Sequence, residues 1–141
     1  MARRAENVLM AADVDLGYPD ARRLNVTENA RGLQAAGCDV ELVSRGPDPG
    51  IAGVRYRAAA SSHSGRLRRL TAVNAWAIAR AAARRRDARS LYVRYDWGLL
   101  PTIVAGRALG YRVVLEVNAL TSVGSERGAP PGFIHAARER L

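Results

Sequence analysis

The most constraining feature of the chain is a pair of β-branched and aromatic runs with a helical pattern between them. The runs are residues 91–94 and 112–117, and each ends in polar residues. Residues 99–109 have a helical pattern that stops at Gly110. Strand, helix and strand in this order predict a βαβ unit. Open parallel sheets bind ligands beyond the carboxyl ends of their strands, so we expect a functional rim there.

The same alternation is predicted upstream. Residues 7–12 form a short apolar run, typical of a buried parallel strand that ends at Asp13. Residues 13–20 mix acids with turn formers and are expected to form a loop. Asp20 is expected to cap a helix that runs to about Ala36 and stops at Gly37. Residues 39–44 alternate and predict a second strand. The residues expected to face the core from this helix are Leu24, Ala30, Leu33 and Ala36.

The central region continues the pattern. Pro47, Pro49 and Gly50 break the chain, and residues 53–57 predict a third, less buried strand. A long helix is expected over residues 66–86. Its expected core face consists of Leu67, Leu70, Val73, Ala77 and Ile78. After a loose segment, residues 133–141 resemble the start of another helix. The prediction is an α/β fold, a Rossmann-like, doubly wound parallel sheet that is truncated at its C-terminus.

Length and composition narrow the classes of protein. A chain of 141 residues is expected to form one domain. No apolar run approaches the roughly 20 residues of a membrane span, and none has the length of a secretory leader, so we expect a cytoplasmic protein. Cys38 is the sole cysteine, and no cysteine or histidine spacing resembles a metal site. The glycine motifs of dinucleotide-binding and P-loop proteins are absent.

The positive charge is concentrated in one segment. All 22 basic residues are arginine and the net charge is +9. Residues 66–89 hold eight arginines against Asp87, a local excess of +7. This segment is interpreted either as a solvated helix or as a patch that binds phosphates or an anionic membrane surface. The sequence has no nucleic-acid reading motif, so nucleic-acid binding is not favoured. The patch residues are Arg80, Arg84, Arg85, Arg86 and Arg89.

Two segments of the expected rim have side chains suited to a ligand. In the first loop, Gly17 permits close approach, and the amides of the next helix start favour an anion. Beyond the fourth strand, an arginine, an acid and two aromatic rings are suited to bind phosphate, hydroxyls or a sugar face. The alternative is that Asp96 caps the next helix and Trp97 packs beneath it. The candidates are Gly17, Tyr18, Arg22 and Arg23, with Arg94, Tyr95, Asp96 and Trp97.

The order of these segments resembles a known family. Residues 18–23, then a helix, then residues 37–44 resemble the opening of the N-terminal domain of family 4 glycosyltransferases of the GT-B fold. Residues 91–98 and 115–120 resemble two later segments of that domain. The resemblance covers roughly residues 7–126. It implies an acceptor-binding half of an enzyme that transfers a sugar from a nucleotide-sugar, with retention and without an obligatory metal or other cofactor.

The resemblance also assigns individual positions. Gly17 matches a glycine of the first loop, where many relatives have two, and Arg22 or Arg23 matches an arginine at the helix start. Asn118 stands where many relatives have histidine. An asparagine there orients hydroxyls and is no general base. Glu126 lies where a relative's acidic pair is expected. No catalytic residue is assigned.

The donor-binding features of the family have no counterpart in residues 1–141. The paired-glutamate motif and the basic residues for the donor diphosphate are missing, so we expect the chain alone to be inactive and to need a donor-binding domain or subunit. The alternative is a non-catalytic module that binds a glycan or the inner face of a membrane through the arginine patch. Glu116 is interpreted as a structural or ion-paired residue, and His63 and His135 as surface residues.

Overall fold

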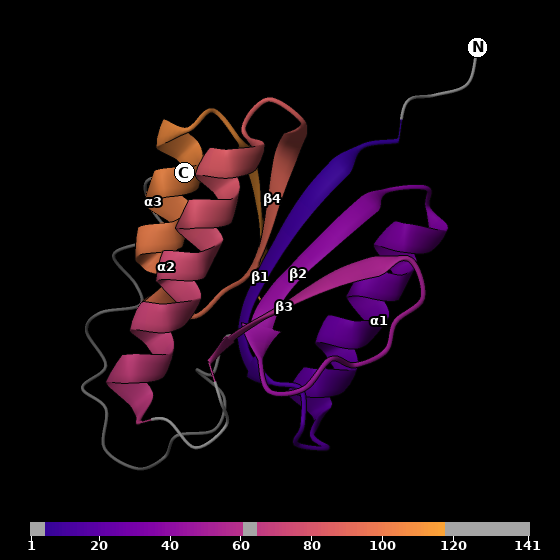
Figure 1. Ribbon diagram of the computed structural model, residues 1–141, viewed down its shortest axis with the longest axis vertical. Coiled ribbons are helices and arrows are strands. Elements are labelled where there is room, and N and C mark those ends of the chain that lie inside the picture. Colours follow the sequence, from indigo (N-terminus) through magenta and orange to yellow (C-terminus); the bar gives the residue numbers. More distant parts are fainter. Residues whose placement is uncertain (1–4, 61–64, 118–141) are drawn as a thin grey trace, which may run out of the picture.

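The computed structural model describes residues 5–60 and 65–117, which form a five-stranded parallel sheet between two layers of helices (Figure 1). The strand order is β3-β2-β1-β4-β5, as in a Rossmann-like fold. All five strands run in the same direction, so their carboxyl ends share one edge. The strands are β1 (Asn7–Asp15), β2 (Asp39–Arg45), β3 (Val54–Ala60), β4 (Ala88–Arg94) and β5 (Arg112–Glu116).

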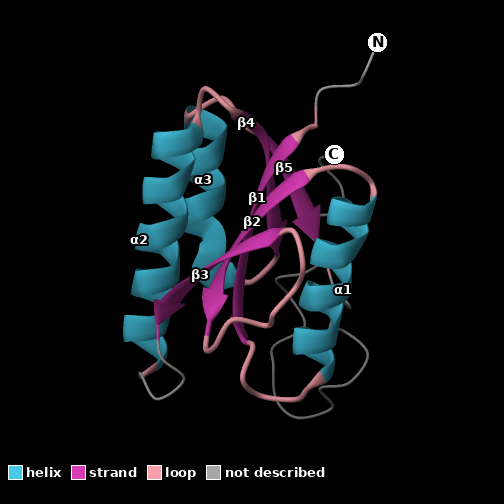
Figure 2. Cartoon of the chain, turned by 45° about the vertical axis from the view of Figure 1, so that its right-hand side comes forward, coloured by secondary structure: helices cyan, strands magenta, loops and turns pink. Residues whose placement is uncertain are grey.

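The helices divide the core into two clusters, one on each face of the sheet (Figure 2). Helix α1 (Ala21–Ala35) covers one face, with Val26 and Ala30 packed on β1 and β2. Helices α2 (Arg66–Arg84) and α3 (Leu100–Ala108) cover the other, α3 being preceded by the short 3-10 helix η1 (Trp97–Leu99). The predicted fold class and element order are therefore confirmed.

Helix ends follow the local sequence. Asp20 accepts a hydrogen bond from the Arg23 amide and begins α1, as predicted. Gly37 and Gly110 follow α1 and α3 with φ of +86° each, a conformation that glycine adopts at least cost. The proline-rich connection from β2 to β3 contains no helix, which leaves α1 alone on its face of the sheet in the described residues.

Several details differ from the sequence prediction. Strand β1 extends to Asp15, because Asp13 pairs with Arg45 of β2 across a bulge in the register. Helix α2 ends at Arg84, two residues early. Leu24 and Leu67 are 58% and 79% exposed instead of facing the core. Ala36 is also exposed. The expected helix over residues 133–141 lies outside the described residues.

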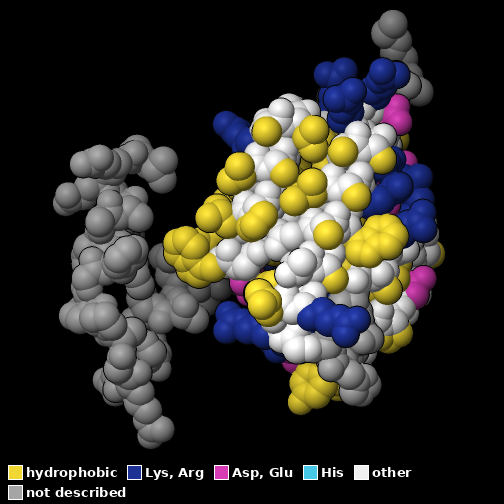
Figure 3. Space-filling view, turned by 60° about the vertical axis from the view of Figure 1, so that its left-hand side comes forward, with side chains coloured by type: hydrophobic (Ala, Val, Ile, Leu, Met, Phe, Trp, Pro, Cys, Tyr) yellow, Lys and Arg dark blue, Asp and Glu magenta, His cyan; other side chains and the backbone are white. Residues whose placement is uncertain are grey.

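The outer side of the α2 and α3 layer is mostly apolar. Figure 3 shows hydrophobic side chains spread over the middle of this side, with arginines toward its ends. Neither α2 nor α3 contains an acidic residue. No described helix has the length and apolar character to cross a membrane.

Candidate functional site

The carboxyl edge of the sheet brings two of the predicted segments together. The loop after β1 holds Gly17, Tyr18 and the start of α1, and the segment after β4 holds residues 95–97. A hydrogen bond from Arg94 Nη1 to the carbonyl oxygen of Arg22, 3.4 Å long, joins the two. Asn118 and Glu126 lie outside the described residues.

The loop after β1 owes its glycine to packing. The Gly17 amide donates to Asp15 Oδ1 at 2.9 Å. A Cβ at position 17 would lie 2.9 Å from Cδ of Pro47, in the loop after β2. The sequence analysis interpreted Gly17 as a position that permits close approach of a ligand. The close contact between the two loops explains the glycine instead. Tyr18 projects from the same loop and is largely exposed.

The start of α1 is already occupied by an anion of the protein itself. Asp20 accepts from the Arg23 amide at 2.8 Å and from Arg22 Nε at 2.8 Å. The hydrogen bond from the Arg23 amide is the largest cause that holds the pKa of Asp20 below its usual value; burial opposes it, and the Arg22 side chain adds to the lowering. This carboxylate fills the helix-start position that was predicted to favour an external anion.

Arg23 instead borders a shallow depression beside α1. Its volume is about 300 Å³. Two arginines and two prolines contribute to it, so it combines cationic and apolar surface. The lining residues are Pro19, Asp20, Arg23, Leu24, Thr27, Arg31 and Pro49.

Arg94 is held in place by a polar cluster on the α1 side of β4 and β5. Its side chain is mostly buried and lies 3.5 Å from Glu116. Glu116 also accepts from Asn29 Nδ2 at 2.9 Å and from the Tyr92 hydroxyl at 3.1 Å. Burial and the charge of Glu116 raise the pKa of Tyr92 to about 12. The interpretation of Glu116 as an ion-paired residue is confirmed, and Arg94 is a fixed part of this edge.

The segment after β4 presents two aromatic rings. Asp96 accepts from the Gly98 amide at 2.8 Å and caps η1, as one of the two interpretations predicted. The second half of that interpretation is wrong, since Trp97 does not pack beneath the helix but is 75% exposed. The rings of Tyr95 and Trp97 meet edge to face with centroids 5.6 Å apart. The edge therefore carries an exposed Trp97 ring, held by a partly buried Tyr95, beside a carboxylate.

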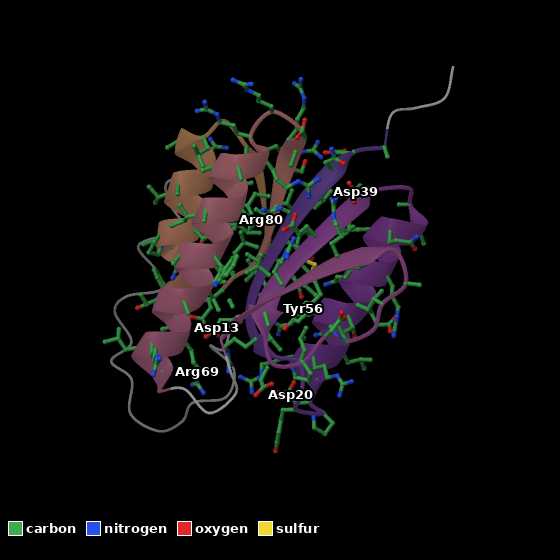
Figure 4. All side chains as sticks on the ribbon, in the orientation of Figure 1. Asp13, Asp20, Asp39, Tyr56, Arg69 and Arg80 are labelled. Atoms are coloured by element: carbon green, nitrogen blue, oxygen red, sulfur yellow. The ribbon has the colours of Figure 1, made fainter. Side chains whose placement is uncertain are left out.

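A buried ion pair that the sequence prediction missed lies behind this edge. The side chains of Asp13 and Arg45 contact each other and are about nine-tenths buried. The Ser44 hydroxyl lies 2.9 and 2.7 Å from the carbonyl oxygens of Ala12 and Val14 and holds the bulge in β1. Figure 4 shows Asp13 and Arg69 toward the end of the molecule where α2 begins. The sequence offered one signal for this ion pair: β1 and β2 were predicted to be parallel neighbours, and such pairing places their last residues side by side.

The predicted arginine patch divides into two parts. Arg80 Nε lies 2.6 Å from Glu41 Oε1, and Arg84 Nη1 lies 2.9 Å from Glu41 Oε2. Arg80, which is labelled in Figure 4, and Arg84 therefore share one strand carboxylate and are not free cations. Arg85, Arg86 and Arg89 are exposed.

The groups at the carboxyl edge form a candidate binding surface. Within residues 5–60 and 65–117, no three side chains of histidine, cysteine, aspartate or glutamate are grouped to hold a metal ion. The exposed groups at the carboxyl edge are aromatic rings, a carboxylate and arginines. Such groups stack on rings and bind hydroxyls or phosphates.

Comparisons with known proteins identify the fold. No family model matches the chain, and no curated protein matches it in sequence. Among solved structures, the C-terminal domain of a hydrogenase from Pyrococcus furiosus is similar, with a TM-score of 0.56 at 11% identity over 80% of this chain and 92% of that one.

Two glycosyltransferases of the GT-B fold are also similar in structure. UGT2 of Phytolacca americana, solved with UDP-2-fluoroglucose and pterostilbene, has a TM-score of 0.59 at 12% identity. MurG of Acinetobacter baumannii has a TM-score of 0.51 at 14% identity. The match covers 82% and 78% of this chain, but it spans only 31% and 34% of theirs. The chain has a GT-B-like, Rossmann-like fold the size of one part of these enzymes.

Proposed function

We propose that the chain is the acceptor-side part of a family 4-like glycosyltransferase, which transfers a sugar with retention from a nucleotide-sugar to a glycan, a lipid-linked or a small-molecule acceptor. The similarity to UGT2 and MurG supports a glycosyltransferase-like fragment. The order of sequence motifs supports the family and the acceptor side. The hydrogenase domain has a similar fold, so the fold alone does not decide the activity.

The observation that carries the proposal is the aromatic pair at the carboxyl edge, in which the Trp97 ring is exposed. Trp97 is held edge to face by Tyr95, so its ring is oriented before a ligand arrives. The C–H face of a pyranose ring stacks on such a surface, and the adjacent Asp96 carboxylate accepts from sugar hydroxyls. Arg94 is fixed by Glu116 and positions this segment against α1.

The donor would be bound by another domain or subunit. Residues 1–141 contain neither the paired glutamates nor the basic residues that the resemblance leads us to expect for a nucleotide-sugar. We therefore propose that the chain is inactive alone, and the family resemblance implies a reaction without an obligatory metal. We place the reaction in the cytoplasm, in keeping with a chain whose one cysteine can form no internal disulfide.

A glycan array probed with the fluorescently labelled chain tests acceptor binding. We expect selective binding to a small group of glycans and at least about tenfold weaker binding by Trp97→Ala, because an exposed aromatic anchor is removed. Trp76→Ala is the matched control, since Trp76 is exposed on α2, away from the carboxyl edge. Equal effects of the two variants, or binding to no glycan, would contradict the proposal.

The dependence on a donor-binding part is tested by an activity assay. The glycans selected on the array are incubated with the chain and radiolabelled UDP-glucose, GDP-mannose or UDP-N-acetylglucosamine. We expect no transfer above background. Transfer by the chain alone at rates typical of enzymes would refute the argument from the missing donor motifs.

A further inference from the structure

Helices α2 and α3 lie side by side, and the side chains that they expose are mostly apolar (Figure 3). Asn74 of α2 joins them, since its Nδ2 donates to the Gly98 carbonyl at 2.6 Å and its Oδ1 accepts from the Thr102 amide at 3.1 Å. With the single exception of Thr71, every exposed residue of α2 between Arg69 and Arg84 is alanine or tryptophan. We call this surface the α2–α3 outer face: Ala75, Trp76, Ala79, Ala82, Ala83, Leu100, Pro101, Val104 and Ala108.

Large side chains make this face more than an alanine stripe. Trp76 is 46% exposed, Val104 is 60% exposed and Leu100 is 47% exposed. Packing inside the domain does not require their exposure, because the opposite sides of both helices already cover the core through Val73, Ala77 and Ile103. An exposed apolar surface of this kind indicates an interaction site.

Unpaired arginines border the face at both ends. Arg66 and Arg68 lie in the first turn of α2, and Arg85 and Arg86 follow its last turn. Arg107 lies in the last turn of α3. All five are exposed, and none has an ion-pair partner among the described residues. Figure 3 shows arginines toward the ends of this side and acidic side chains only at its margins.

The Glu41 cluster separates these arginines from the structural ones. Arg80 and Arg84 are both paired with Glu41 beneath α2, so their guanidinium groups are held against the sheet. Arg85, Arg86 and Arg107 are exposed and form no ion pair among the described residues, and Asp87 is the one acid next to them in the sequence. This distribution distinguishes a surface that attracts an anionic partner from a helix that merely contains many arginines.

We propose that the α2–α3 outer face docks on an anionic lipid membrane, with its apolar middle at the acyl boundary and its arginines on the phosphate headgroups. An interfacial helix surface needs an apolar side at this boundary together with basic side chains, whose long stems allow the charge to reach the headgroups. A second copy of the chain fits the charges poorly, because arginines predominate at both ends of the face and Asp87 is the only acid beside those at the end of α2. A nucleic acid does not account for the exposed apolar middle. The proposal is independent of glycosyl transfer.

Vesicle binding of the 141-residue chain tests this docking. The vesicles contain equal parts of phosphatidylcholine and phosphatidylglycerol, and pure phosphatidylcholine serves as the reference. We expect the chain to bind the anionic vesicles and not the vesicles of pure phosphatidylcholine. Each arginine near such a surface contributes about fivefold, so Arg85→Glu with Arg86→Glu is expected to weaken binding by at least about 25-fold. Both side chains are exposed, so the variant is expected to fold, which circular dichroism checks.

A charge-matched control separates the face from net charge. Arg31→Glu with Arg112→Glu makes the same change in charge on α1 and β5, where Arg31 and Arg112 are exposed and pair with Glu28 and Glu6. We expect this variant to keep most of its vesicle binding. Equal losses in the two double variants would overturn the proposal, since attraction would then depend on total charge alone.

Fluorescence of Trp76 reports contact of the apolar middle. Trp97→Phe leaves Trp76 as the only tryptophan. On anionic vesicles we expect a blue shift of its emission and protection from iodide. A Trp76 emission that does not shift and is fully quenched by iodide would overturn the proposal. Binding to duplex DNA would also overturn it if the chain that retains Trp76 and the Trp76→Ser variant bind with equal affinity. A dimer in sedimentation without lipid that Trp76→Ser dissociates would do the same, because a second copy would then occupy the face.

Discussion

Replacement of Glu41 by glutamine tests the cluster that anchors α2 to the sheet. Glu41 lies in β2, is 1% exposed and accepts hydrogen bonds from Arg80 and Arg84. Arg57 lies 3.6 Å away. Burial opposes ionisation of Glu41, but these arginines outweigh it and hold the pKa of Glu41 below its usual value.

The magnitude follows from what Glu41→Gln leaves behind. Arg84 is 9% exposed, and its remaining acidic neighbour is Asp39 at 3.5 Å. Arg80 is more exposed and can reach water. Removing one partner of a buried ion pair costs about 3 to 5 kcal/mol, and the access of Arg80 to water favours the lower value. With a urea m-value of about 1.5 kcal/mol per M, about 3 kcal/mol lowers the unfolding midpoint by about 2 M.

Urea unfolding at several pH values measures this cost. The folded pKa of Glu41 is lowered, so the stability that its ionisation contributes is complete above the unfolded pKa of about 4.3 and is lost as the pH falls through the folded value. Glutamine does not titrate. The difference in unfolding free energy between wild type and Glu41→Gln is therefore expected to be largest at neutral pH and to shrink below about pH 4.

Two further variants make the test decisive. Glu28→Gln removes the ion pair with Arg31, in which each side chain is about half exposed. This change is expected to cost less than about 0.5 kcal/mol. Arg84→Met combined with Glu41→Gln is expected to cost less than the sum of the single changes, because the unpaired cation is removed. A loss below about 1 kcal/mol for Glu41→Gln at neutral pH, or a loss that does not change down to pH 3, would refute the reasoning.

Two other predictions concern the helix contacts, and urea midpoints measure both. Asn74→Ala is expected to cost about 2 to 3 kcal/mol, because it leaves the buried amide of Thr102 without its acceptor; a change below about 0.5 kcal/mol would contradict this. Gly106→Ala is expected to destabilise by about 1 to 2 kcal/mol, since its Cβ would lie 2.3 Å from Cδ2 of the buried Leu91. A Cβ at position 32 of α1 would meet no atom within 4 Å, so Gly32→Ala is expected to stabilise the fold by about 0.5 to 1 kcal/mol. If Gly106→Ala and Gly32→Ala change the free energy of unfolding in the same direction, the contact with Leu91 does not matter.

The order of elements was predictable because it depends on local patterns. Uninterrupted apolar runs mark β1 and β4, and Asp20, Gly37 and Gly110 mark helix ends by their own backbone preferences. The error at the end of β1 arose from a long-range contact. Asp13 and Val14 do not resemble a strand until Arg45 and Ser44 of the neighbouring strand supply their partners.

The faces of the helices were harder to predict than their positions. Leu24 and Leu67 have the right residue type for a core face, but the buried side of each helix is decided by the sheet against which it packs. The same holds for charge. Glu41 interrupts an apolar strand, and Arg80 and Arg84 are four residues apart on one helix, yet only the packing of α2 on β2 shows that they belong together.

The candidate site was predictable as an edge but not in its details. Parallel strands made it certain that residues after β1 and β4 would share an edge, and Arg94 does contact the Arg22 carbonyl. Whether Asp96 capped a helix and whether Trp97 was covered depended on the path of η1, which the sequence alone left open. The exposure of Trp97 contradicts packing beneath the helix and leaves the ring available to stack on a ligand, as the other interpretation expected.

The two proposed surfaces depend on different residues and can fail separately. Acceptor binding depends on Tyr95 and Trp97 at the carboxyl edge, whereas membrane docking depends on Trp76 and on Arg85 and Arg86 at the other end of α2. Because α2 begins near the carboxyl edge and ends at the opposite edge, docking of its outer face leaves the carboxyl ends of the strands beside the lipid and not beneath it. A lipid-linked acceptor would then reach Trp97 from the membrane surface. If the Arg85 and Arg86 variant loses vesicles but keeps glycan binding, the two surfaces are independent, and a shared loss would show instead that the edge is disturbed by changes in α2.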